Sequence, residues 1–336
     1  MAELMAETAN MALSQNTKSN YQTVKNNIDR CEKVMGKDMS FPWETSQVLT
    51  FVGYLLYERK VMAKTANMQL SGVRMAHIEQ GHDCPCLRPP IVSLLLKGKE
   101  HWDNVIGKLE NRKTRAPVTI DMMKVIKRGL CKSKLSDDRK KMLWAIACLN
   151  WAGSLRIHES LTKNKKTFDK QTTLMGQDLK IQSIKIDKKT VKMIKLSLKC
   201  TKESRIGGGT VLEIFENKTF LCPVAAIEKY IASRKDKVRA DKPFFREFSG
   251  KNFTGKDFNK ELKTLTSKIT DGSNQIISSH SFRAGVASEM AKRNYTDAEI
   301  MAQGRWSSDA YRAYCKLPRA RRLTLSYRMV AQECQR

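Results

Sequence analysis

The amino-acid sequence predicts a mainly α-helical protein of two domains, with one small antiparallel β-sheet in the second domain. Apolar residues recur at helical intervals through residues 17–109 and again after residue 118. A polar, basic segment that contains a proline, residues 111–117, separates the two regions. Three segments within residues 178–215 instead alternate apolar with polar residues, which is typical of strands.

In the first region we expect a flexible N-terminus over residues 1–16 and a helical domain over residues 17–110. Proline, cap residues and apolar spacing predict four short helices there. They are expected over residues 17–35, from Pro42 through the apolar positions up to residue 56, over residues 64–79, and from Pro89-Pro90 to residue 109. Four short helices rich in basic residues form a compact module. We interpret residues 111–117 as the linker between the domains.

The second region begins with two helical patterns and then changes its periodicity. The helices are expected over residues 120–130 and 137–149, and the strands around residues 179–181, 190–198 and 210–215. Residues 187–189 and the glycines 207–209 are placed at the turns between the strands. Helices resume at residues 223–231 and continue toward the C-terminus, which places one small sheet inside a helical domain.

Composition points to a polyanionic partner. Among 336 residues, 62 are lysine or arginine and 34 are acidic, which is a formal net charge of +28 spread along the whole chain. Such a charge favours nucleic acid as the partner, whereas the alternative is a basic surface that is simply solvated. The sequence contains neither an apolar segment of membrane-spanning length nor a signal peptide, so we expect an intracellular protein with no membrane partner.

The richest chemistry lies in residues 278–316. His280, Arg283, Trp306, Tyr311 and Tyr314 supply a base, a cation, an aromatic wall and two phenols within this short segment. Apolar spacing places His280 and Arg283 on the first turn of a helix, after two serines, at 278 and 279, that we expect to cap it. Helix N-termini also offer unpaired backbone N–H groups, so this turn suits a phosphate.

The motif H-S-F-R at 280–283, followed by G-R-W-S-S-D-A-Y-x-x-Y at 304–314, resembles the C-terminal signature of tyrosine recombinases. The similarity is greatest to the enzymes of DIRS-type and Crypton-type eukaryotic mobile elements. G-S-L-R-I-H-E at 153–159 is similar to the first-arginine motif of that family, and residues 70–85 resemble the third helix of its core-binding domain. The resemblance implies a core-binding domain over 17–110 and a catalytic domain over 118–336, with an exchange helix at 323–335.

The resemblance also implies a role for each matching residue. Arg156 and Arg283 would clamp the scissile phosphate, and His280 would exchange protons. Glu159 would support the clamp or His280, and Trp306 would supply a packed wall and an indole N–H donor. The nucleophile would be Tyr314, because in the family the tyrosine that closes the motif attacks, and Tyr311 is the alternative.

A lysine on the turn between the second and third strands serves as the general acid in this family. The segment around Thr201-Lys202-Glu203 aligns with that position, so Lys202 is the candidate. Lys199 is the alternative, because position rather than residue type must decide among so many lysines.

The implied activity is site-specific DNA recombination by a eukaryotic mobile element through a 3′-phosphotyrosyl intermediate, without metal or cofactor. Its partner would be double-stranded DNA, bound by a homotetramer on two sites with a dimer on each, in the nucleus. Two alternatives are a domesticated DNA-binding protein that lost catalysis and a type IB topoisomerase. Retention of the expected polar residues argues against the first, and H-S-F-R with the helical module argues against the second.

The spacing of the cysteines and histidines does not predict a metal site. The nine cysteines are irregularly spaced, which fits reduced thiols rather than a disulfide framework. His77, His82, Cys84 and Cys86 lie within ten positions of one another. Cys-Pro-Cys lacks the two-residue spacing of paired zinc ligands and no second pair follows, so we expect a structural loop there and no metal.

Overall fold

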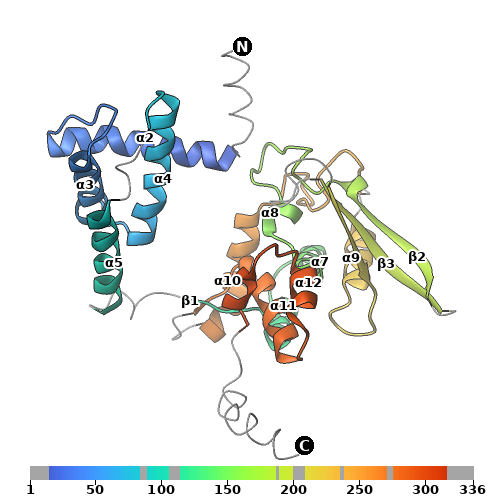
Figure 1. The fold of residues 1–336 in the computed structure, drawn as a ribbon. Helices are drawn as coiled ribbons and strands as arrows, with labels where there is room; N and C mark the ends of the chain where they lie inside the picture. The colour runs from blue at the N-terminus through green and yellow to red at the C-terminus, as the bar shows by residue number, and fades with distance from the viewer. Residues whose placement is uncertain are drawn as a thin grey trace, which may run out of the picture. The chain divides into compact units, whose positions relative to one another are not determined.

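The computed structural model describes residues 15–83, 89–105, 114–186, 189–199, 209–234, 238–270 and 275–315 (Figure 1). The chain divides into two compact units, Met1–Arg112 and Lys113–Arg336. Each unit has a hydrophobic core of its own. The predicted fold class is confirmed, because the described residues are mostly helical and include one three-stranded antiparallel sheet. None of the helices in these ranges is both long and apolar enough to cross a membrane.

The first unit consists of short helices around one core. They are α2 (Gln15–Met35), α3 (Thr45–Gly53) with its π-helical continuation η1 (Tyr54–Glu58), α4 (Ala63–Glu79) and α5 (Pro90–Val105). The helix α2 begins two residues before the predicted start. Phe51, Leu55 and Val73 are among the fully buried side chains of the first unit, so the apolar positions that predicted the helices do face the core.

His77 is a structural residue of this first unit. It is fully buried, its Nε2 accepts a hydrogen bond from the backbone N–H of Trp43 at 3.0 Å, and its Nδ1 lies 2.9 Å from the carbonyl oxygen of Val73. The Nε2 contact therefore joins α4 to the segment before α3, whereas the Nδ1 contact lies within α4. Cys84 and Cys86 lie outside the described residues, and those described contain no group of three or more potential metal ligands.

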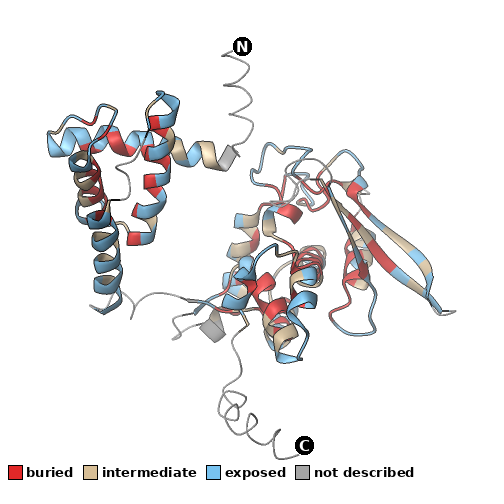
Figure 2. Cartoon of the chain, in the orientation of Figure 1, coloured by how far each residue is buried: buried red, intermediate tan, exposed pale blue. Residues whose placement is uncertain are grey.

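The second unit is built around α7, which is surrounded by other elements. Its helices are α6 (Ile120–Lys132), α7 (Asp137–Ala152), α8 (Ile157–Ser160), α9 (Pro223–Ser233), α10 (Gly255–Thr270), α11 (His280–Lys292) and α12 (Asp297–Gly304), with the 3-10 turns η3 (Gly176–Asp178) and η4 (Asp309–Ala313). Residues 142–150 of α7 are all buried (Figure 2). A helix that is buried on every side forms the centre of a core, and α7 holds the neighbouring helices at fixed positions.

The antiparallel sheet has the strand order β2 (Leu179–Ile186), β3 (Lys189–Leu198) and β4 (Thr210–Phe215). Leu179 pairs with Leu196, and Leu198 pairs with Thr210. Apolar residues of β3 are buried against the core that includes α9, and the other face is more exposed. The alternation that predicted these strands thus reflects one buried face.

A second, parallel pairing joins β1 (Thr114–Arg115) to β5 (Gln275–Ile276). Thr114 and Arg115 fall within the predicted linker, but in the structure they form part of the second unit. The backbone N–H of Val118 then donates to the carbonyl of Ser281 at 2.8 Å. Two-residue strands show no periodicity, so only the tertiary structure reveals this pairing. It fixes Arg115 close to the start of α11.

Candidate active site

A turn after α7 directs one carbonyl group toward two arginines. Ser154 has φ of +48°, a left-handed conformation that is uncommon for residues other than glycine. Its carbonyl oxygen accepts hydrogen bonds from Nη1 of Arg283 at 3.0 Å and from Nη2 of Arg305 at 3.3 Å. Strained backbone conformations of this kind persist where the surroundings hold them, and here they orient two guanidinium groups.

Glu159 is the buried carboxylate of the site. Its side chain is 1% exposed and accepts hydrogen bonds from the backbone N–H of Arg156 at 2.9 Å, from Nη1 of Arg156 at 3.1 Å and from Nη2 of Arg305 at 2.9 Å. Burial by itself would raise the pKa of Glu159, but the hydrogen bonds and charges of Arg305 and Arg156 hold this pKa below its usual value. The ionised carboxylate therefore orients both arginines, and the three side chains together keep an excess of positive charge.

Arg305 was not predicted as a site residue, although it lies inside the G-R-W motif. It has φ of +53° at the end of α12, and its backbone carbonyl accepts from Nη2 of Arg283 at 3.4 Å. Its side chain binds the carboxylate of Glu159. Arg305 is therefore a positioning residue that connects the first-arginine turn to the first turn of α11.

Arg283 and Tyr314 are connected through Trp306. Arg283 is 7% exposed, and its guanidinium carbon lies 4.6 Å from the centroid of the Trp306 ring. The ring of Trp306 in turn lies 6.4 Å from that of Tyr314. A side chain at Gly304 would overlap the indole, so glycine is needed there to seat Trp306.

The two candidate tyrosines differ sharply in exposure. Tyr311 is 1% exposed, packs with the buried Ala287 and Ile300, and its hydroxyl accepts from Nε of Arg312 at 3.5 Å. Tyr314 is 43% exposed. Its backbone carbonyl accepts a hydrogen bond from Ser288 on α11 at 2.8 Å. The 3-10 turn η4 thus buries the first phenol and presents the second to solvent.

His280 is the first residue of α11 and is exposed, although its imidazole is partly covered. Burial lowers the pKa of His280 from its ordinary 6.5, and the charges of Arg115, Arg156 and Arg283 lower it further. A lowered pKa keeps the imidazole neutral at neutral pH, which is the form that accepts a proton.

Ser279, one of the two serines predicted to cap α11, is its N-cap residue, but its side chain does not make the expected capping hydrogen bond. Ser279 already has a helical backbone and makes no capping hydrogen bond through its side chain, and the hydroxyl groups of Ser278 and Ser279 are buried without partners among the described residues. Instead, the backbone N–H of Ser279 donates to Oδ1 of Asn259 on α10 at 2.8 Å. The backbone N–H of Ser278 donates to the hydroxyl of Ser281 at 3.1 Å. Residues distant in sequence therefore secure the start of this helix.

Of the two candidates for the general acid, Lys202 and Lys199, the structure describes only Lys199. Lys202 lies outside the described residues. Nζ of Lys199, at the end of β3, lies 2.8 Å from the buried carboxylate of Asp178 and donates to the carbonyl of Lys170 at 3.1 Å. Because Lys199 is held by these partners, its position favours a structural role.

No protein-family model matches the chain, and no curated protein matches its sequence. Several solved structures do match in fold. An integrase of the transposon Tn1549 in complex with circular intermediate DNA is 14% identical, with a TM-score of 0.56 over 94% of each chain. A lambda integrase dimer bound to a COC' core site is 13% identical, with a TM-score of 0.54 over 94% of this chain and 75% of that one. The site-specific recombinase XerH in a post-cleavage complex with a palindromic difH substrate is 9% identical, with a TM-score of 0.53 over 89% of this chain and 76% of that one.

The fold is that of the tyrosine recombinases. In this chain the tyrosine recombinase fold gathers residues from three separate segments, around 115, 154–159 and 280–314. It brings Arg156, Glu159, His280 and Arg283 together, and it connects Tyr314 to them through Trp306. These are the side chains that the sequence motifs single out, with Lys202 outside the described part of the chain.

We expect the imidazole of His280 in the DNA-free protein to titrate below 6.5, because burial and three arginines disfavour its charged form. Arg156→Gln removes one of these cations and should raise the pKa. Titration of the imidazole by NMR measures both values, with His280→Gln identifying the resonance. A pKa of His280 above 6.5 in the wild-type protein would contradict the arrangement of cations described here.

Proposed function

We propose that this protein is a tyrosine recombinase that cuts and rejoins DNA strands through a 3′-phosphotyrosyl intermediate. The observation that carries the proposal is the connection of Arg283 through Trp306 to an exposed Tyr314, beside the Arg156–Glu159 pair. The fold likeness supports it, since the matching integrases and recombinase are described in complex with DNA. The net charge of +28 fits a DNA ligand.

In the proposed reaction Arg156 and Arg283 bind the non-bridging oxygens of the scissile phosphate. The planar guanidinium group offers paired N–H donors that match two oxygens and does not lose its proton. Both groups are held in advance, Arg156 by Glu159 and Arg283 by the carbonyl of Ser154. Donors oriented before the reaction stabilise the charge that develops on phosphorus-bound oxygens.

The proton transfers follow from the same arrangement. The phenolic oxygen of Tyr314 forms a bond to phosphorus while the bond from phosphorus to the 5′-oxygen breaks. His280 accepts the phenol proton, and Lys202 donates a proton to the leaving 5′-oxygen. The products are a 3′-phosphotyrosyl ester and a free 5′-hydroxyl, and attack by another 5′-hydroxyl on the ester reverses the step.

We extend the proposal to the biological context that the motifs imply. The first unit serves as the core-binding domain and contributes to DNA binding together with the second unit. The expected exchange helix, residues 323–335, lies outside the described residues. Exchange between two duplexes needs several nucleophiles, which supports a homotetramer on two sites with a dimer on each. The H-S-F-R and G-R-W-S-S-D-A-Y motifs support a DIRS-type or Crypton-type mobile element acting in the nucleus of a eukaryote.

The decisive test begins with selection and sequencing of DNA bound by the purified protein. The selected duplex, nicked next to the candidate cut position, would trap the protein as a covalent adduct. We expect an adduct through tyrosine at the 3′ side of the break. Binding without any adduct would instead support a domesticated DNA-binding protein, and relaxation of a supercoiled plasmid that lacks partner sites would support a type IB topoisomerase.

We expect Lys202→Ala to slow cleavage by about a hundredfold to ten-thousandfold while DNA binding persists, because a general acid contributes on that order. A substrate with sulfur in place of the bridging 5′-oxygen should restore the rate, since a thiolate leaves without a proton. Single-turnover cleavage of both substrates measures the effect. Lys199→Ala is the matched control, and rescue of this variant instead would move the assignment to Lys199.

A further inference from the structure

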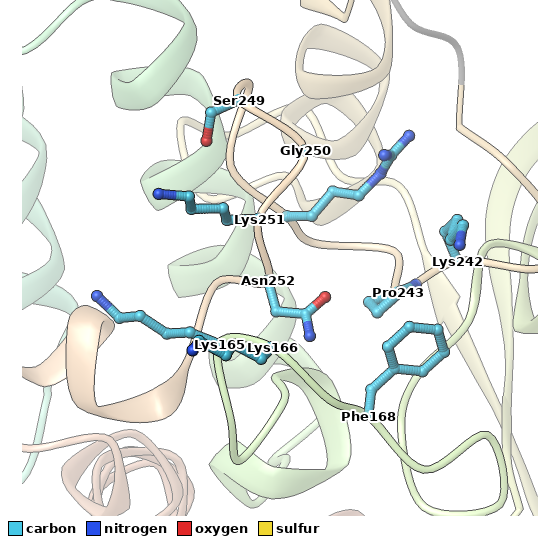
Figure 3. Close-up of a pocket in the computed structure, with 10 residues that line it drawn as sticks. Lys165, Lys166, Phe168, Lys242, Pro243, Ser249, Gly250, Lys251 and Asn252 are labelled. Atoms are coloured by element: carbon cyan, nitrogen blue, oxygen red, sulfur yellow. The ribbon is translucent and has the colours of Figure 1, made fainter.

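A second basic site lies in the second unit, apart from the residues described above. It is a cavity of about 650 Å³, and Figure 3 shows the side chains that line it. Two segments form it, the loop after α8 and the loop before α10. Its lining includes five cationic side chains, an aromatic ring and no carboxylate. The cationic side chains are Lys165, Lys166, Lys242, Arg246 and Lys251, and the ring is that of Phe168.

The two loops are held against each other by hydrogen bonds. Asn252 is 7% exposed, and its side-chain amide donates to the carbonyls of Asn164 at 3.2 Å and Thr167 at 3.4 Å. Its backbone N–H donates to the carbonyl of Lys165 at 3.3 Å. Lys165 and Lys251 therefore extend from backbone segments that these hydrogen bonds already hold together.

The positive charge of the cavity is only partly balanced. Lys165 pairs with Asp257 at 2.9 Å. Within the described ranges no carboxylate lies within ion-pair distance of Lys166, Lys242 or Lys251. Glu247, which is close along the chain, pairs with Arg139 at 2.7 Å. The cavity thus presents at least three uncompensated ammonium groups, which favours an anion.

The two loops that form the cavity are connected to α8 and α10, which also hold residues of the candidate active site. The first follows α8, whose Glu159 binds Arg156. The second leads into α10, whose Asn259 holds the backbone of Ser279. At their bases Thr162 and Thr254 form a β-bridge. A ligand in the cavity would therefore be held at a fixed position relative to the arginine clamp.

We propose that this cavity binds a backbone phosphate of DNA at a position other than the one that is cut. The proposal rests on the proposed function, since that function makes DNA the ligand. DNA repeats its phosphates along each strand, so a second cationic site in the same rigid frame fixes the register of the strand. Phe168, with Nζ of Lys242 at 6.0 Å from its ring centroid, offers an apolar wall to the adjoining sugar.

The test uses the double substitution Lys166→Gln with Lys251→Gln in the full chain and a DNA duplex of about 30 base pairs at a series of salt concentrations. Each phosphate contact contributes about 0.9 to the magnitude of the slope of log affinity against log salt, so loss of this one contact should reduce that magnitude by about 0.9 and lower the affinity at low salt. Both lysines are exposed, so the fold should persist. The charge-conserving pair Lys166→Arg with Lys251→Arg should keep the wild-type slope.

A matched control removes the same amount of charge elsewhere. Lys124→Gln with Lys192→Gln replaces two lysines that are already paired, with Asp121 at 2.9 Å and with Glu228 at 2.6 Å. This control should change the salt slope less than the cavity pair does. Equal slopes in the two double variants would overturn the cavity site while leaving the proposed function intact, whereas wild-type protein that binds no DNA would overturn the proposed function itself.

Discussion

Tyr314→Phe is expected to abolish the covalent protein–DNA adduct while DNA binding persists. The substitution removes only the hydroxyl oxygen that would attack phosphorus. Tyr314 is 43% exposed, and its anchoring contact to Ser288 uses the backbone, so the fold should be unchanged. A nicked trapping substrate, analysed on a denaturing gel, measures the adduct, and a mobility shift under native conditions measures binding.

Tyr311→Phe is the matched control and should still form the adduct. Tyr311 is buried, and its hydroxyl makes a weak hydrogen bond of 3.5 Å with Arg312, so its loss should cost at most about 1 kcal/mol of stability. The opposite pattern, with an adduct in Tyr314→Phe and none in Tyr311→Phe, would show that the buried phenol becomes the nucleophile.

Arg283→Lys is expected to lower the cleavage rate by about a hundredfold to a thousandfold, although the positive charge is kept. Removal of one pre-oriented donor from a site of developing negative charge has effects of this order. The planar guanidinium of Arg283 donates to the carbonyl of Ser154, packs over Trp306 and still has donors for a phosphate. The ammonium group of lysine cannot make all of these contacts at once. Single-turnover cleavage with saturating protein separates this rate from DNA affinity.

Arg293→Lys provides the control at the other end of α11. Its guanidinium is largely exposed and pairs with Glu289 at 3.6 Å, so the exchange should leave the cleavage rate nearly unchanged. Thermal unfolding of both variants should be compared, because a large fall in stability of Arg283→Lys would explain a low rate without any role in catalysis. Wild-type cleavage by a stably folded Arg283→Lys would contradict the proposed phosphate clamp.

Local patterns in the sequence were sufficient for most helices and for the sheet. Apolar spacing predicted α4, α6 and α7 to within a few residues, because a helix that packs on a core buries positions three and four apart. Alternation predicted the strands of the sheet because β3 buries one face. These signals arise between residues that are close along the chain, which is why they are legible without a structure.

Only the tertiary structure decided how the site is held together. The hydrogen bond from Arg283 to Ser154 joins residues 129 positions apart, and the one from Arg305 to Glu159 spans 146 positions. No periodicity encodes such pairs, so neither the positioning role of Arg305 nor the hydrogen bond from the backbone of Ser279 to Asn259 could be predicted from the sequence. The sequence alone determined which side chains carry the chemistry, because motifs record residue types. The folded chain determined which phenol is exposed and which arginines share one carboxylate, because burial and electrostatics depend on three-dimensional proximity.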